Sequence, residues 1–181
     1  MERSYFVWRG LRICISERGS GAPLFLVPGI GCSADMWEPF MEFFPDSRLI
    51  SFDAPGTGRS MTPLYPVSVV ALASLAAAVL DACGVAQADV VGFSYGGAVA
   101  QQLARNYPQR VDRLVLAATN CGLGSVLGSP EALRVMATPM RFYSPSCFER
   151  VAPDIYGGVT ARDASKREQD PKGPRHQWPP N

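Results

Sequence analysis

Histidine is nearly absent from this sequence of 181 residues, in which His176 is the only one. An excess of charge of either sign is also missing, because 17 Lys and Arg against 16 Asp and Glu give a formal net charge of +1. Without a basic stripe, nucleic acid and anionic membrane surfaces are not expected partners. No apolar run approaches the length of a transmembrane segment, and the first residues do not resemble a signal peptide, so we expect a cytoplasmic protein.

Paired cysteines are missing as well. The five cysteines are odd in number and widely spaced, with no Cys-x-x-Cys pair, so neither a disulfide framework nor a metal site is expected. We interpret them as reduced thiols of the core, at Cys14, Cys32, Cys83, Cys121 and Cys147. Apolar residues are abundant and make up 47% of the chain, which is typical of a globular domain with a sizeable core.

Predicted strands alternate with predicted helices in the first two thirds of the chain. Short apolar runs bounded by Pro, Gly or Asp predict buried parallel strands at residues 24–27, 48–52, 88–93 and 113–118. Helical spacing predicts helices from Val69 to Leu80, with Gly84 as C-cap, and from Val99 to Tyr107. A hairpin is predicted over residues 5–15. This alternation predicts a doubly wound, mostly parallel α/β sheet, with ligands at the carboxyl ends of its strands.

The pattern changes after Thr119. Two short helices, at residues 130–138 and 145–152, share an apolar face and predict the start of a helical cap over residues 121–160. Beyond them hydrophobicity collapses, and residues 161–181 cannot bury enough apolar surface to offset chain entropy. We therefore expect an α/β core over residues 1–120, a cap start, and a disordered tail.

A serine stands between a predicted strand and a predicted helix. Residues 90–97 read Val-Val-Gly-Phe-Ser-Tyr-Gly-Gly and contain the pattern Gly-x-Ser-x-Gly. A sharp turn at this pattern lifts the serine hydroxyl above the end of a sheet, which makes Ser94 the candidate nucleophile. The alternative is a glycine-rich turn that binds nothing or a phosphate. A dinucleotide loop would need Gly-x-Gly-x-x-Gly, which Gly92, Gly96 and Gly97 do not match.

A second glycine-rich loop follows the strand predicted at residues 24–27. It reads Val-Pro-Gly-Ile-Gly over residues 27–31, and its glycines let backbone N–H groups approach a ligand. The oxyanion of a tetrahedral intermediate needs two such donors, commonly the residue after the nucleophile and one from this loop. The backbone N–H groups of Ile30 and Tyr95 are therefore the candidate oxyanion hole. The alternative is a tight turn without a ligand.

Residues 52–60 form a third loop, Phe-Asp-Ala-Pro-Gly-Thr-Gly-Arg-Ser. It lacks the Lys-Ser/Thr ending of a phosphate loop and a helix directly behind it. We interpret it as structural, with Asp53 hydrogen-bonding to backbone in the turn. Asp53 as the acid of a catalytic triad is the alternative.

The acid and the base that a serine nucleophile requires are hard to find. A serine hydroxyl needs a positioned base, usually a histidine held by a carboxylate. His176 lies among prolines with no strand before it to fix its position, which favours a solvated tail histidine. The loop after Ala118 offers Thr119 and Asn120 and no carboxylate before Glu131.

With these three loops in order on successive strands, the chain resembles the α/β-hydrolase superfamily from about Pro23 to Gly158. It is most similar to the intracellular medium-chain-length poly(3-hydroxyalkanoate) depolymerases. The segments that carry this resemblance are 91–102, 114–119 and 152–158, together with residues 136–143 and Ser146 at the start of that family's cap.

The resemblance implies a cofactor-free ester hydrolase without a metal, in which Ser94 attacks an apolar ester or a stored polyester. An acyl-enzyme would form, and water would release a 3-hydroxyalkanoate; the polyester granule surface is the implied partner. In that family the triad Asp and His follow two further strands, and the sequence ends before them. We therefore expect a C-terminally truncated chain of low activity. The alternative is a non-catalytic pseudohydrolase that acts as a binding module.

Overall fold

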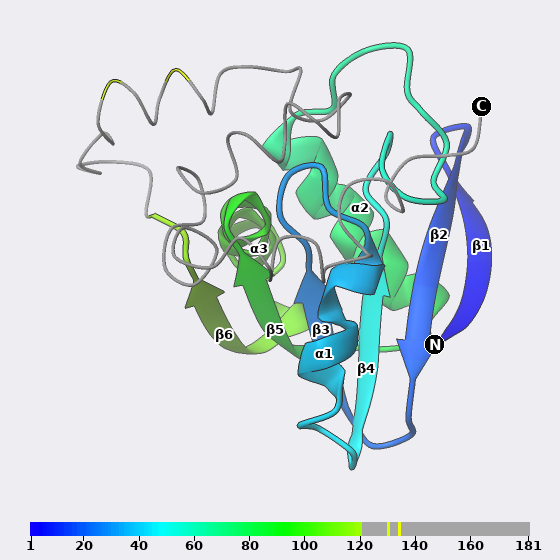
Figure 1. Ribbon diagram of the computed structural model, residues 1–181, viewed down its shortest axis with the longest axis vertical. Helices are drawn as coiled ribbons and strands as arrows, with labels where there is room; N and C mark the ends of the chain where they lie inside the picture. The colour runs from blue at the N-terminus through cyan, green and yellow to red at the C-terminus, as the bar shows by residue number, and fades with distance from the viewer. Residues whose placement is uncertain (121–129, 131–133, 135–181) are drawn as a thin grey trace, which may run out of the picture. The chain divides into compact units, whose positions relative to one another are not determined.

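A computed structural model of the protein describes residues 1–120 together with residues 130 and 134 (Figure 1). The strands are β1 (Glu2–Trp8), β2 (Leu11–Arg18), β3 (Ala22–Val27), β4 (Ser47–Phe52), β5 (Ala88–Phe93) and β6 (Val111–Ala117). The helices are η1 (Ala34–Trp37), α1 (Glu38–Met41), α2 (Val69–Ala82), α3 (Tyr95–Asn106) and η2 (Pro108–Arg110). The predicted cap and tail lie outside this part of the chain and stay predictions.

The six strands form one sheet in the order β1-β2-β4-β3-β5-β6. Strand β3 runs parallel to both β4 and β5, and β6 runs parallel to β5. The hairpin of β1 and β2 adds two antiparallel strands beside β4. The predicted mostly parallel α/β sheet is confirmed, as is the hairpin.

The sheet contains a topological switch point beside β3. From β3 the chain moves to β4 on one side and later returns to β5 on the other side. Loops leaving the carboxyl ends of β3 and β5 therefore diverge, which is where ligands bind in sheets of this type. These are the loops that carry Ile30 and Ser94.

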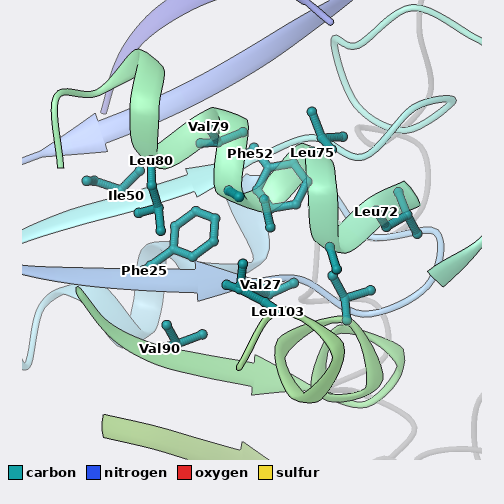
Figure 2. Packing of buried hydrophobic residues seen from close by; sticks show 14 of the residues in the cluster. Phe25, Val27, Ile50, Phe52, Leu72, Leu75, Val79, Leu80, Val90 and Leu103 are labelled. Atoms are coloured by element: carbon teal, nitrogen blue, oxygen red, sulfur yellow. The ribbon is translucent and has the colours of Figure 1, made fainter. Parts of the chain in front are cut away.

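One face of the sheet packs against α2 and α3 (Figure 2). Alternate residues of neighbouring strands point to this face, as the two-residue period of a strand requires. Phe25 of β3 and Phe52 of β4 stack here, with ring centroids 5.7 Å apart and planes 13° apart. The helices contribute the fully or nearly fully buried Leu72, Leu75, Val79, Leu80 and Leu103.

The opposite face of the sheet packs against η1 and α1. Leu26, Leu49 and Val91, each the neighbour of a residue that faces α2, contact Trp37 and Met41 in a second cluster. Neither short helix was predicted, because four residues are too few to show a helical period. Helices on both faces make the sheet doubly wound.

Helix α2 is capped at both ends. The Ser68 hydroxyl accepts a hydrogen bond from the Ala71 N–H at 3.3 Å and caps the amino end. At the other end Gly84 has φ of +66°, and the N–H groups of Gly84 and Val85 donate to the carbonyls of Asp81 and Leu80. This is a Schellman motif, and it confirms that Gly84 ends the helix.

The cysteines of the described part form no disulfide. Cys14 is fully buried in the core, and the half-buried Cys83 packs against the core cluster; Cys32 is half-buried in the loop after β3. Burial raises the pKa of all three thiols, and with the neighbouring Glu17 carboxylate it raises that of Cys83 to about 12. They therefore remain protonated at neutral pH. Cys121 and Cys147 lie outside the described residues.

Strand β6 borders the sheet in the described part of the chain. Its Leu114, Val115 and Leu116 are 36%, 55% and 42% exposed, so apolar side chains on both faces of this edge reach solvent. Within residues 1–120, none of the helices is both long and apolar enough to cross a membrane.

The stacked pair of phenylalanines predicts how the core responds to truncation. Phe25→Ala should lower the free energy of unfolding by about 3–5 kcal/mol, because it removes a fully buried ring and leaves a cavity. Phe43, which is 79% exposed, provides the matched control, and Phe43→Ala should change stability by less than about 0.5 kcal/mol. Urea unfolding of both variants checks this. Equal losses would contradict the assignment of the core.

Candidate active site

Ser94 occupies a strained turn between β5 and α3. Its φ of 53° and ψ of −122° are unusual for a residue with a side chain, and such conformations cost about 1–3 kcal/mol. The Ser94 N–H donates to the Ala117 carbonyl at 2.9 Å, and the Ser94 carbonyl accepts from the Gly97 N–H at 2.9 Å. Ser94 is half-buried, and its hydroxyl does not cap the helix that it precedes. The helix therefore does not hold this hydroxyl, which lies at the carboxyl end of β5.

Each glycine of the turn lies where a side chain would collide. A Cβ at Gly92 would lie 2.7 Å from the Gly96 carbonyl oxygen, and one at Gly97 would lie 2.5 Å from Thr119. A Cβ at Gly96 would overlap the carbonyl oxygens of Val27 and Pro28. The glycine pattern thus records the tight packing of α3 against β5 and against the loops after β3 and β6.

The loop after β3 lies directly beside this turn. Gly29 faces the ring of Phe93, to which an added Cβ would come within 3.2 Å. The loop closes through a hydrogen bond from the Cys32 N–H to the Gly29 carbonyl at 3.1 Å, with Gly31 at φ of 72°. Ile30 is half exposed within this turn. The structure thus brings together the two loops whose N–H groups were predicted as oxyanion donors.

Tyr95 begins α3 and follows the strained serine. The first N–H groups of a helix have no acceptor within the helix, and the partial positive charge of the helix favours an anion at this end. The positions of Tyr95 and Ile30 are therefore compatible with the predicted oxyanion hole, which stays a prediction.

Asp53 connects two loops, because each of its carboxylate oxygens accepts a hydrogen bond from a backbone N–H group. Oδ1 accepts from the Ala34 N–H and Oδ2 from the Arg59 N–H, each at 2.7 Å, while the Asp53 carbonyl accepts from the Ser60 hydroxyl at 2.7 Å. The side chain is buried, and burial raises its pKa against the opposing effect of the two N–H groups. The structural interpretation of Asp53 is confirmed, and both oxygens are already engaged.

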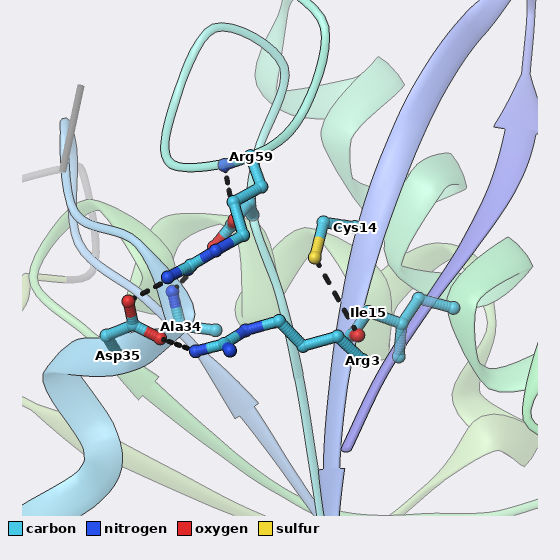
Figure 3. Close-up of polar contacts among 7 residues, drawn as sticks. Arg3, Cys14, Ile15, Ala34, Asp35 and Arg59 are labelled. Atoms are coloured by element: carbon cyan, nitrogen blue, oxygen red, sulfur yellow. Dashed lines mark hydrogen bonds and ion pairs between the residues drawn. The ribbon is translucent and has the colours of Figure 1, made fainter. Parts of the chain in front are cut away.

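Next to Ala34, Asp35 joins two arginines (Figure 3). Arg3 of β1 binds Oδ1 at 3.0 Å, and Arg59 binds Oδ2 at 2.9 Å. Burial alone would raise the pKa of Asp35, but the hydrogen bonds and charges of the two arginines outweigh it and lower the pKa. This ion-pair network was not predicted from the sequence, since its members are 24 and 32 residues apart.

Comparison with known proteins assigns these features to a family. The model of the alpha/beta hydrolase fold matches residues 22–169. The chain belongs to this family.

Among its relatives, the chain is 46% identical over 142 residues to the poly(3-hydroxyalkanoate) depolymerase of Ectopseudomonas oleovorans. That match covers 78% of this chain and 50% of the depolymerase. The 2-hydroxymuconate semialdehyde hydrolase of Pseudomonas sp. strain CF600 is 37% identical over 114 residues, which is 59% of this chain and 40% of the relative. The chain thus spans half or less of these relatives, and the predicted similarity to the depolymerases is confirmed.

A solved hydrolase from Pseudomonas aeruginosa PA01 has a similar structure. It superposes with a TM-score of 0.68 at 26% identity, covering 90% of this chain and 65% of the other. The fold of residues 1–120 is therefore the beginning of an alpha/beta hydrolase core.

The alpha/beta hydrolase core described here contains no histidine, because His176, the only one of the sequence, lies outside it. In the loop after β6, Thr119 packs against Gly97, and the Asn120 carbonyl accepts from Gln101 Nε2 at 2.9 Å. This contact holds the loop beside α3, and it was not predicted because its partners are 19 residues apart. Glu131 also lies outside the described residues.

Gly96 gives a test of the packing that shapes the turn at Ser94. Gly96→Ala should lower stability by about 1–3 kcal/mol or more and slow covalent labelling of Ser94 by a fluorophosphonate, because the methyl group must push α3 away from β3. Gly84→Ala provides a control, since it is strained by its positive φ but meets no atom within 4 Å. It should lose stability without changing the labelling rate. Equal labelling rates in both variants would contradict this packing.

The Asp35 network predicts a loss of stability in acid. Because the pKa of Asp35 is lowered on folding, its contribution is fully present above the unfolded value of about 3.9 and is lost as pH falls through the folded pKa. The free energy of unfolding should therefore fall less steeply below about pH 4 in Asp35→Asn than in the unmodified chain. Chemical unfolding at several pH values measures the two slopes. Parallel curves would show that the ion pairs add no acid-sensitive stability.

Proposed function

We propose that the protein is a carboxylic-ester hydrolase that uses Ser94 as nucleophile and acts on apolar esters of the polyester type. The observation that carries this proposal is the strained turn of Ser94, held against the glycine loop at the switch point of the sheet. The similarity to a poly(3-hydroxyalkanoate) depolymerase supports a polyester or its oligomers as substrate class. No cofactor enters this chemistry.

In the proposed reaction, Ser94 Oγ forms a bond to the ester carbonyl carbon while the serine proton passes to a base. The carbonyl oxygen becomes an oxyanion, which the N–H groups of Ile30 and Tyr95 would stabilise. Collapse of this intermediate breaks the ester C–O bond, and the proton goes to the leaving alkoxide. Water then attacks the acyl-enzyme and releases the carboxylic acid, returning the proton to Ser94.

Under this proposal, residues 1–120 would provide the nucleophile and the oxyanion donors, and they contain no histidine that could act as the base. The carboxylates of Asp35 and Asp53 are engaged by arginines and by backbone N–H groups. Serine hydrolases from which triad residues have been removed still accelerate the reaction about 10³–10⁴-fold over water, through the oxyanion hole and substrate binding. Reaction of Ser94 with an activated reagent is therefore a sharper test than ester turnover.

A serine-directed fluorophosphonate should label the purified chain on the peptide that contains Ser94, and Ser94→Ala should abolish this label. Ser20→Ala, which changes an exposed serine in the turn between β2 and β3, should label like the unmodified chain. Mass spectrometry of the digested protein identifies the site, and circular dichroism confirms folding. Folded protein that remains unlabelled at Ser94 would contradict the proposal.

A non-catalytic binding module is the second candidate, favoured by the absence of histidine from residues 1–120. It would bind polyester particles without hydrolysing a short-chain p-nitrophenyl ester. Turnover of that ester that disappears in Ser94→Ala would exclude it.

A further inference from the structure

The loop between β3 and η1 must hold one N–H group in a fixed place if it is to bind an oxyanion. Such a donor acts only when it lies 2.7–3.1 Å from the position that the oxyanion will occupy. Residues 28–33 contain two glycines, and Ile30 in their middle is half exposed. Pro28 and the hydrogen bond from the Cys32 N–H to the Gly29 carbonyl restrict the loop internally, but where the loop stands relative to Ser94 has to be set at its two ends.

The first end of the loop is fixed by α3. The carbonyl oxygens of Val27 and Pro28 lie so close to Gly96 that a Cβ there would overlap them. The loop therefore starts in contact with the turn that carries Ser94.

The second end is fixed by Asp53. Its Oδ1 accepts from the N–H of Ala34, the first residue of η1 and a completely buried one. Its Oδ2 accepts from the Arg59 N–H, and the chain wraps so tightly around the carboxylate that a Cβ at Gly58 would overlap it. The Arg59 side chain then binds Asp35, the residue after Ala34. One carboxylate thus ties the loop after β4 to the end of the loop after β3.

Two different buried side chains anchor the loop after β4, and only Asp53 connects it to η1. The Ser60 hydroxyl, on the same loop, donates to the Asp53 carbonyl and accepts from the Cys14 N–H at 2.9 Å. Ser60 therefore ties the loop to β2, whereas the Asp53 side chain ties it to η1. These two buried anchors can be removed independently.

We infer that Asp53 is a positioning residue of the active site, which fixes the Ile30 N–H for oxyanion binding by holding Ala34 at the far end of the loop. This inference rests on the proposed function of Ser94. The Asp53 carboxylate does not touch the substrate in this scheme. It determines whether the loop presents its N–H group in one conformation or in several.

The experiment compares Asp53→Ala, Asp53→Asn and the matched control Ser60→Ala in the full chain. Asparagine retains an acceptor oxygen for the Ala34 N–H but cannot accept from the Arg59 N–H, so it should rescue the loop more than it rescues stability. Two readouts are taken at a temperature at which all variants are folded. They are amide hydrogen exchange of the peptide covering residues 28–35 and the fluorophosphonate labelling of Ser94, resolved into reagent affinity and maximal rate.

Asp53→Ala should lose the protection of this peptide and lower the maximal labelling rate at least about tenfold, since losing one oxyanion donor costs about 10²–10³ in rate. Asp53→Asn should fall between it and the unmodified chain. Ser60→Ala should unfold more easily yet keep both loop protection and labelling rate. A loop that is equally protected in Asp53→Ala and Ser60→Ala, or a loosened loop with an unchanged rate, would overturn the inference.

The two proposals can fail separately. If the unmodified chain is not labelled at Ser94, the proposed function fails. Hydrogen exchange then still decides whether Asp53 holds the loop: lost protection in Asp53→Ala alone supports the anchoring, and equal protection contradicts it.

Discussion

The contact between Gly96 and the backbone that leaves β3 is the constraint on which the rest of the site depends. Helix α3 approaches the Val27 and Pro28 carbonyl oxygens more closely than any side chain would allow. This approach fixes the direction in which β5 turns into α3, and therefore where the Ser94 hydroxyl stands. It also places the glycine loop beside that hydroxyl. A single steric requirement thus brings the candidate nucleophile and a candidate donor together.

The strained turn persists because the core on either side of β5 leaves the strand no freedom to relax. Val90 and Val91 point to opposite faces and pack in the two separate clusters, so β5 can neither rotate nor slide. Its parallel pairing with β3 and β6 fixes the register, and the Ser94 N–H is held by the Ala117 carbonyl. The strain at Ser94, about 1–3 kcal/mol, is small beside the burial of these two clusters.

Local patterns were sufficient to predict the longer elements and the turn at Ser94, and insufficient to predict contacts between loops. Strands β3 to β6 appear in the sequence as short apolar runs and helix α2 shows its helical period, while the glycines around Ser94 mark positions where a Cβ would collide. Helix α1 is too short to show a period. The bonds from Asp53 to Ala34 and from Asp35 to Arg59 depend on where the fold brings distant segments, 19 and 24 residues apart. Sequence could suggest that Asp53 binds backbone, but not which backbone.

Under the proposed function, the reactivity of Ser94 depends on two separate groups. One is the pair of oxyanion donors, and the other is the base that accepts the serine proton. The oxyanion donors act on charge that develops on the carbonyl oxygen, whichever group accepts the serine proton. Their contribution therefore depends on the rigidity of the described core, through Gly96 at one end of the loop and Asp53 at the other. The base adds a separate factor, which requires placement within hydrogen-bond reach of Ser94. A core that holds its donors rigidly keeps the first contribution even where the second is lost.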